Sequence, residues 1–162
     1  MARRVFFSFH FERDIWRVNQ VRNSNVVAGY EKAGFFDHSE YQEVKQRGDA
    51  AIRRKIRQRL AGTTVTVVLI GSETAQRDWV RFEIDESIAQ RNGFLGIYIH
   101  HLEDQGGNSS WSWWPPTKPF VPPGIDFPCY DWDEDVDKFR RAIEDAGRRA
   151  DRWRAMDGVR AR

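Results

Sequence analysis

The run VTVVLI at residues 65–70 most constrains the fold of this chain. An unbroken aliphatic and β-branched run of this length is typical of a strand buried on both faces of a parallel sheet. Gly71 and Ser72 end the run, and a short polar loop leads to a helix predicted to begin near Arg77 or Asp78. The sequence therefore predicts a strand–loop–helix unit in the middle of the chain.

One carboxylate stands out in this unit. Trp79 and Glu83 are four residues apart and share one flank of the predicted helix. Val80, Ile84 and Ile88 form a neighbouring line that would pack on the sheet, so Glu83 borders the packed face. The helix starts just after the carboxyl end of a strand, where open α/β sheets bind their ligands. Glu83 is therefore a candidate for chemistry.

Strands and helices alternate along the rest of the chain. This alternation predicts a single domain over residues 1–162, a three-layer α/β sandwich with a parallel sheet. Residues 38–48 are expected to be a polar loop with room for a turn of helix, and Asp49 is the expected N-cap of the helix that follows. Predicted strands cover residues 4–9, 34–37, 65–70, 95–99 and 129–132, and predicted helices cover 12–22, 49–62, 79–91 and 134–156.

The segment 103–128 differs from the rest in composition. It holds all six prolines, several glycines and serines, and a cluster of Trp111, Trp113 and Trp114. No regular element fits it, and long irregular segments in compact domains are commonly functional. The tryptophans predict a cover over the domain, a gate or a subunit interface. The last residues, 147–162, are expected to fray as a helix in solvent.

Charge, cysteine content and the length of apolar runs indicate the expected partners and cellular setting. The formal net charge is +2 with acidic and basic residues interleaved, so neither a nucleic acid nor a membrane surface is expected as a partner. Cys129 is the single cysteine, which excludes an internal disulfide and predicts a cytoplasmic setting. The start of the chain has no apolar core of a signal peptide, and no run reaches the roughly 18 apolar residues of a membrane helix.

Four stretches together resemble the TIR (Toll/interleukin-1 receptor) domain family. VFFSF ends in Ser8-Phe9 like the family's opening strand, and residues 35–37, followed by Arg47-Gly48, are similar to its second strand and loop. VTVVLIGS and then WVRFE match the region that carries the catalytic glutamate of TIR enzymes. RVFFSFHF, RVN at 17–19 and VRN at 21–23 resemble more closely the TIR-like subunits of Thoeris anti-phage defence.

The resemblance implies a fold and an activity. It implies a flavodoxin-like, five-stranded parallel sheet of order 2-1-3-4-5. It also implies an enzyme that cleaves the nicotinamide–ribose bond of NAD and makes a cyclic ADP-ribose isomer. Such an enzyme works as a homo-oligomer, and its diffusible nucleotide switches on a separate effector protein. NAD is then the substrate, and no other cofactor is expected.

Glu83 is the residue that this chemistry would use. Departure of nicotinamide leaves an oxocarbenium-like ribose, which a nearby carboxylate stabilises while accepting bonds from the ribose hydroxyls. The alternative is a surface glutamate paired with Arg77, Arg81 or Arg91. Trp79 would shape the pocket around the ribose, or fill the gap between helix and sheet.

The remaining candidate substrate-binding residues lie after the first two strands. Ser8, Phe9 and His10 follow the first strand and would line the same crevice. His10 could contact phosphate or ribose, or be an exposed loop histidine. Asp37 and Tyr41 fall where the family has a mobile substrate-covering loop, and Tyr41 could stack on a base or pack half-buried.

Other site types fit less well. Neither GxGxxG nor GxxxxGK[ST] occurs, so a Rossmann-type or P-loop nucleotide site is not expected. His100 and His101 are adjacent and would diverge on a strand, so no metal site is expected at them.

Three other function classes remain as alternatives. A non-enzymatic TIR adaptor acting by homotypic contact is the main one. A response receiver is disfavoured because Ser8-Phe9-His10 stands where an acidic pair is needed. A nucleoside N-glycosidase that uses one glutamate is the third, and substrate profiling would distinguish it from an NAD-cleaving enzyme.

Overall fold

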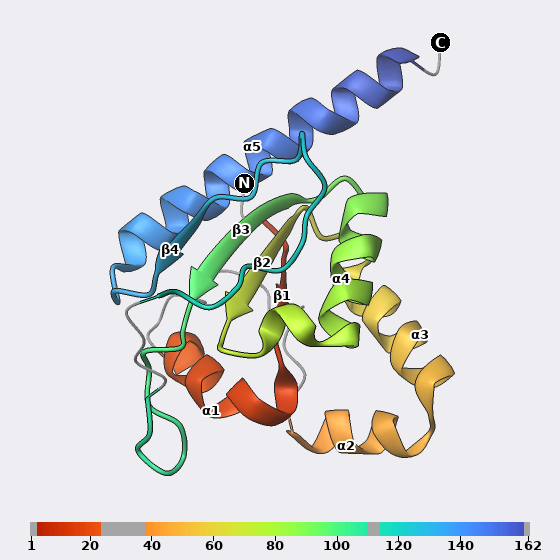
Figure 1. Cartoon of the computed structure of the whole chain (residues 1–162). Coiled ribbons are helices and arrows are strands. Elements are labelled where there is room, and N and C mark those ends of the chain that lie inside the picture. Colours follow the sequence, from red (N-terminus) through yellow and green to blue (C-terminus); the bar gives the residue numbers. More distant parts are fainter. Residues whose placement is uncertain (1–2, 24–37, 110–113, 161–162) are drawn as a thin grey trace.

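The computed structural model describes residues 3–23, 38–109 and 114–160, and Figure 1 shows their arrangement. In chain order the elements are β1 (Val5–Ser8), α1 (Phe11–Val21), α2 (His38–Gln46), α3 (Asp49–Leu60), β2 (Val65–Ile70), the 3-10 helix η2 (Thr74–Gln76), α4 (Asp78–Ala89), β3 (Gly93–Tyr98), β4 (Cys129–Asp131) and α5 (Val136–Arg160). Helices separate β1 from β2 and β2 from β3, as the sequence predicts, whereas the described residues between β3 and β4 contain no helix.

The described strands form one parallel sheet in the order β1-β2-β3-β4. Val5 pairs with Val65, Val65 with Gly93, and Gly96 with Cys129. Because all four strands run the same way, their carboxyl ends share one edge, at the lower side of Figure 1. The predicted second strand at 34–37 lies outside the described residues, so the five-stranded order 2-1-3-4-5 stays a prediction.

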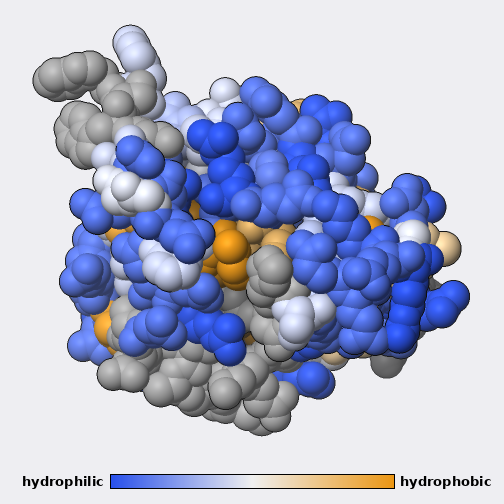
Figure 2. All heavy atoms as spheres, turned by 90° about the horizontal axis from the view of Figure 1, so that it is seen from below, coloured by the Kyte–Doolittle hydropathy of each residue, from blue (hydrophilic) through white to orange (hydrophobic). Residues whose placement is uncertain are grey.

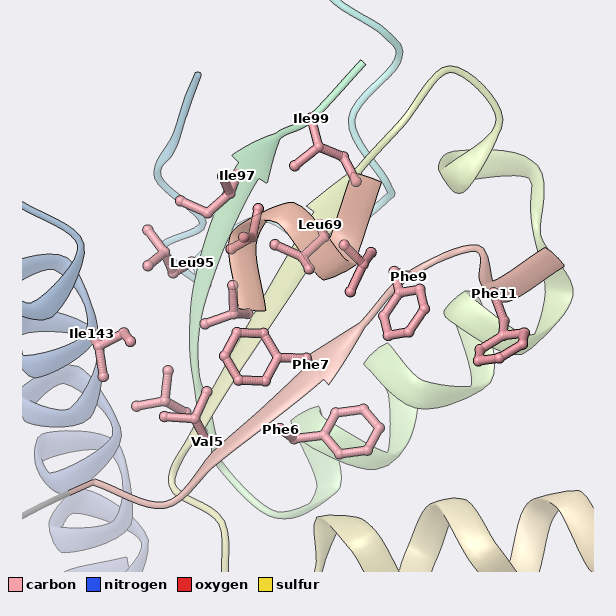
Figure 3. Close-up of a cluster of buried hydrophobic side chains, with 14 of the residues drawn as sticks. Val5, Phe6, Phe7, Phe9, Phe11, Leu69, Leu95, Ile97, Ile99 and Ile143 are labelled. Carbon is pink, nitrogen blue, oxygen red and sulfur yellow. The ribbon is translucent and has the colours of Figure 1, made fainter. Parts of the chain in front are cut away.

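Strand β2 is buried at every position, which confirms the two-faced burial predicted for it. Its alternate residues enter two different apolar clusters. Val67 and Leu69 belong to the cluster that contains Phe139 and Ile143 of α5. Val68 and Ile70 belong to the cluster that contains Val80 and Ile84 of α4. Figure 3 shows the first cluster, in which Phe6 and Phe7 of β1 point away from each other.

An irregular segment completes the second face of the sheet. Residues 114–128 contain no helix or strand, as predicted for this part of the chain. Phe127 packs edge-on against Phe94 of β3 with ring centroids 5.8 Å apart. A Cβ on Gly96 of β3 would lie 2.3 Å from Sγ of Cys129. Glycine at this position therefore lets β4 and the irregular segment pack closely on β3.

The predicted polar loop at 38–48 is wrong, because residues 38–46 form helix α2. Tyr41 is only 8% exposed, so this short helix owes its stability to tertiary contact more than to propensity. Glu40 forms ion pairs with Lys55 and Arg59 of α3. The N-cap of α3 is Gly48 at φ 92°, and Asp49, expected at that position, is the first helical residue.

The expectation that residues 147–162 fray into solvent as a helix is wrong for residues 147–150, whereas the described residues after 154 are mostly exposed. Helix α5 continues to Arg160, and Gly147 and Ala150 are buried against the sheet. Arg154 donates hydrogen bonds to the carbonyl oxygens of Gln90 and Thr63. The arginine therefore ties the distal half of α5 to the amino-terminal edge of the sheet. Within the described ranges, no helix combines the length and apolar character that crossing a membrane needs.

Candidate active site

Glu83 is buried at the carboxyl edge of the sheet. It lies on α4, and its side chain accepts a hydrogen bond at Oε2 from Oγ of Ser8, the last residue of β1. Glu83 is 7% exposed, so the alternative of a solvated surface glutamate is wrong. Two of the three arginines named as its possible partners pair with other carboxylates: Arg77 with Glu12, and Arg91 with Asp157.

Burial changes the proton affinity of this carboxyl group. Loss of hydration raises the pKa of Glu83 from 4.5 to about 8, while the hydrogen bond from Ser8 acts in the opposite direction. A buried carboxyl group with a strongly raised pKa in a cavity is typical of functional sites. Burial therefore favours the protonated form of Glu83 at neutral pH, and a positive charge beside it would favour the ionised form.

A mainly aromatic cavity surrounds Glu83. Its volume is about 30 Å³, room for a water molecule or two. Figure 2 looks onto the edge where the strands end and shows an apolar area near the middle of a mostly hydrophilic face. The residues that line the cavity are Phe7, Phe9, Phe11, Tyr41, Val44, Ile52, Ile56, Arg77, Trp79 and Glu83.

The structure brings together most of the residues that the sequence singled out. Phe9, Tyr41, Trp79 and Glu83 share the cavity, and Ser8 reaches it through its bond to Glu83. Trp79 is partly buried, with its ring edge-on to Phe82 at 6.0 Å. These placements make the cavity the candidate active site.

Among the described residues, the predicted site residues Ser8 and His10 are not in the cavity lining. His10 is the N-cap of α1, where its Nδ1 accepts a hydrogen bond from the backbone N–H of Arg13. Asp37 lies outside the described residues. Contact of His10 or Asp37 with substrate stays a prediction.

Sequence reasoning missed Phe11 as a cavity residue and gave Arg77 no role in the site. The Phe11 ring stacks on Tyr41 with centroids 4.1 Å apart and an interplanar angle of 19°. Arg77 donates a hydrogen bond to the Tyr41 hydroxyl at 3.3 Å. The alternation Phe7-Phe9-Phe11, which continues beyond the strand, was the available signal for Phe11. Arg77 had no signal beyond its place before the helix.

The adjacent histidines make protein contacts of their own. His101 Nε2 lies 2.8 Å from the carbonyl oxygen of Trp132, and the buried His100 packs edge-on against Tyr98. Burial lowers the pKa of His100. No group of three or more His, Cys, Asp and Glu side chains suited to a metal ion occurs in the part of the chain that the structure describes.

Comparison with known proteins identifies the family. A family model described as "Thoeris protein ThsB, TIR-like domain" matches residues 6–104, which include Ser8, Tyr41 and Glu83. The "Putative cyclic ADP-D-ribose synthase ThsB1" of Bacillus cereus (strain MSX-D12) is 47% identical over 110 residues. The match covers 67% of this chain and 57% of that relative, so the chain spans less than two thirds of the relative's length. The chain belongs to the family of Thoeris ThsB proteins with a TIR-like domain.

Proposed function

We propose that this protein cleaves the nicotinamide–ribose bond of NAD and closes the ADP-ribose into a cyclic isomer, a second messenger in anti-phage defence. The observation that carries the proposal is the buried Glu83 carboxyl group, hydrogen-bonded to Ser8 within an aromatic cavity. The printed name of the 47% identical relative, a putative cyclic ADP-D-ribose synthase, supports the same chemistry.

The reaction asks for one carboxylate beside the sugar. When the bond between ribose C1′ and the nicotinamide nitrogen breaks, its electron pair leaves with neutral nicotinamide and the ribose becomes oxocarbenium-like. An ionised Glu83 about 4 Å away would stabilise that charge by about 4 kcal/mol at an effective dielectric near 20. The cationic nicotinamide ring of the substrate favours ionisation of Glu83, because an opposite charge nearby lowers a carboxyl pKa.

The fate of the sugar cation depends on which nucleophile reaches C1′. Water would give linear ADP-ribose, whereas a hydroxyl or adenine nitrogen of the same molecule would give a ring. A mainly apolar cavity with room for few waters favours the internal nucleophile. NAD is therefore consumed as the substrate, and the proposed reaction needs no further cofactor.

The biological setting follows from the same proposal. The product would diffuse to a separate effector protein, and the active enzyme would be a cytoplasmic homo-oligomer with neither a nucleic acid nor a membrane as partner. The family match, which covers residues 6–104, supports a role in Thoeris defence. Analytical ultracentrifugation with and without NAD measures the assembly.

The decisive experiment follows nicotinamide release from NAD by the purified protein and, in parallel, in extract from phage-infected cells. Mass spectrometry separates linear from cyclic product. We expect release by the wild type and by Asp85→Asn, a matched control because Asp85 is exposed on the same helix. Glu83→Gln should lose about 10²–10³ in rate. Full activity in Glu83→Gln would contradict the site, and no release by the wild type in either setting would indicate an adaptor.

A further inference from the structure

We propose that Arg77 binds the diphosphate of the nucleotide substrate and makes the site select phosphate-bearing substrates over nicotinamide nucleosides. This inference rests on the proposed function, because it takes the scissile ribose to lie at Glu83. The site so far accounts for the sugar and for apolar rings, yet NAD also carries two negative charges. Arg77 is the residue placed to meet them.

Arg77 differs in charge from everything else around the cavity. Among the described residues that line it, Glu83 is acidic, Arg77 is basic, and the others are aromatic or aliphatic. The Arg77 side chain is 28% exposed, so it reaches solvent as well as the cavity. A guanidinium group at such a boundary can receive a diphosphate without itself being carried into an apolar interior.

Arg77 can leave its present partners to bind a phosphate. Its Nη2 lies 3.6 Å from Oε2 of Glu12 and 3.3 Å from the Tyr41 hydroxyl. Glu12 has a closer partner in Lys45, and that hydrogen bond holds the pKa of Glu12 below its usual value. If Arg77 turns toward a phosphate, Lys45 continues to neutralise Glu12. The exchange therefore leaves no carboxylate unpaired.

The spacing along α4 fits the covalent structure of the substrate. Arg77 immediately precedes α4 and stands six residues before Glu83, about 9 Å along a helix axis. The diphosphate of NAD begins one sugar's length from the scissile carbon. With the ribose at Glu83, the diphosphate falls within reach of a long, planar side chain that can form two parallel bonds to phosphate oxygens.

The test compares NAD with nicotinamide riboside, which has the scissile bond but no phosphate. Nicotinamide release is measured for the wild type, Arg77→Ala, Arg77→Lys and Arg81→Ala. Arg81 is the matched control because it is exposed one turn further along the same helix and does not line the cavity. ADP-ribose binding by isothermal titration calorimetry is measured on the same four proteins.

We expect Arg77→Ala to raise KM for NAD by about 10- to 100-fold with little change in kcat, and to leave kcat/KM for nicotinamide riboside unchanged. Arg77→Lys should recover part of the loss, because it keeps the charge but not the paired bonds. An equal loss on both substrates, or an unchanged KM for NAD, would overturn the proposal. If the wild type releases no nicotinamide, the proposed function fails, and ADP-ribose binding alone tests the role of Arg77. Weaker ADP-ribose binding by Arg77→Ala than by Arg81→Ala would then support the contact. Equal binding by the two variants, or no binding by the wild type, would refute it.

Discussion

Ser8 Oγ donates a hydrogen bond to Oε2 of Glu83 across 75 residues of sequence, and so joins the end of β1 to α4. The bond favours the ionised carboxylate, whereas burial of the same carboxyl group favours its neutral form. The site therefore balances two opposed effects on one proton. Both the pH dependence of the reaction and the role of Ser8 follow from this balance.

The activity of the protein should depend on pH through the ionisation of Glu83. Burial raises the pKa of Glu83 to about 8, so below this pH the free protein holds a neutral carboxyl group. The ionised form is the one that stabilises the sugar cation. We expect kcat/KM for NAD to rise about tenfold per pH unit and to level off near pH 8. A kcat/KM that falls over this range would mean that the protonated form is active.

Ser8→Ala provides a second, independent test of the same site. Loss of the donor removes the effect that lowers the pKa of Glu83, so the rising limb should move to higher pH. We expect about tenfold lower kcat/KM at neutral pH and a smaller deficit at alkaline pH. Ser72→Ala is the control, because Ser72 is exposed in the loop after β2. A deficit of equal size at every pH would assign Ser8 a purely structural role.

Arg17→Ala should destabilise the fold strongly. Arg17 is 3% exposed and donates to Oδ1 of the fully buried Asp14 and to the carbonyl oxygens of Leu102 and Asn108. Removing it leaves a buried carboxylate unpaired, which costs about 3–5 kcal/mol. Urea denaturation measures the loss. Arg13→Ala, on the exposed side of α1, should cost less than about 1 kcal/mol, and an equal cost for both variants would refute the argument.

Gly93→Ala tests how closely β3 approaches α5. A Cβ at residue 93 would lie 1.8 Å from the carbonyl oxygen of Ala146, and a backbone atom cannot rotate away. We expect a loss of about 3 kcal/mol or more in unfolding free energy and a lower Tm. Gly158→Ala is the control, because a Cβ there meets nothing within 4 Å and the position is helical. That variant should be as stable as the wild type or slightly more so.

Sequence patterns predict the parts of this fold that depend on local periodicity. The run at 65–70 specifies β2 as a buried strand, and the spacing of Trp79, Val80, Glu83 and Ile84 specifies the orientation of α4. Helix α2 escapes prediction because it is polar and short, and its stabilising ion pairs from Glu40 reach across to another helix.

The candidate site is only partly predictable for a related reason. Its central residue could be chosen by position on a helix, but the hydrogen bond from Ser8 needs β1 to lie beside β2, under α4. Likewise, the stack of Phe11 on Tyr41 joins two helices separated by the undescribed residues 24–37. A one-dimensional pattern carries no distance between such elements, so these contacts emerge only from the three-dimensional arrangement.

The side chains that line the narrow cavity beside Glu83 must move apart before a substrate can enter it. Tyr41 stacks on Phe11 in the cavity wall, and about 30 Å³ remains open. The measured affinity equals the intrinsic affinity multiplied by the fraction of molecules whose walls have parted. Trimming a wall residue such as Val44 should therefore loosen the resting protein and yet tighten capture of the nucleotide. In this domain, contacts that stabilise the free protein around the cavity lower its affinity for the nucleotide.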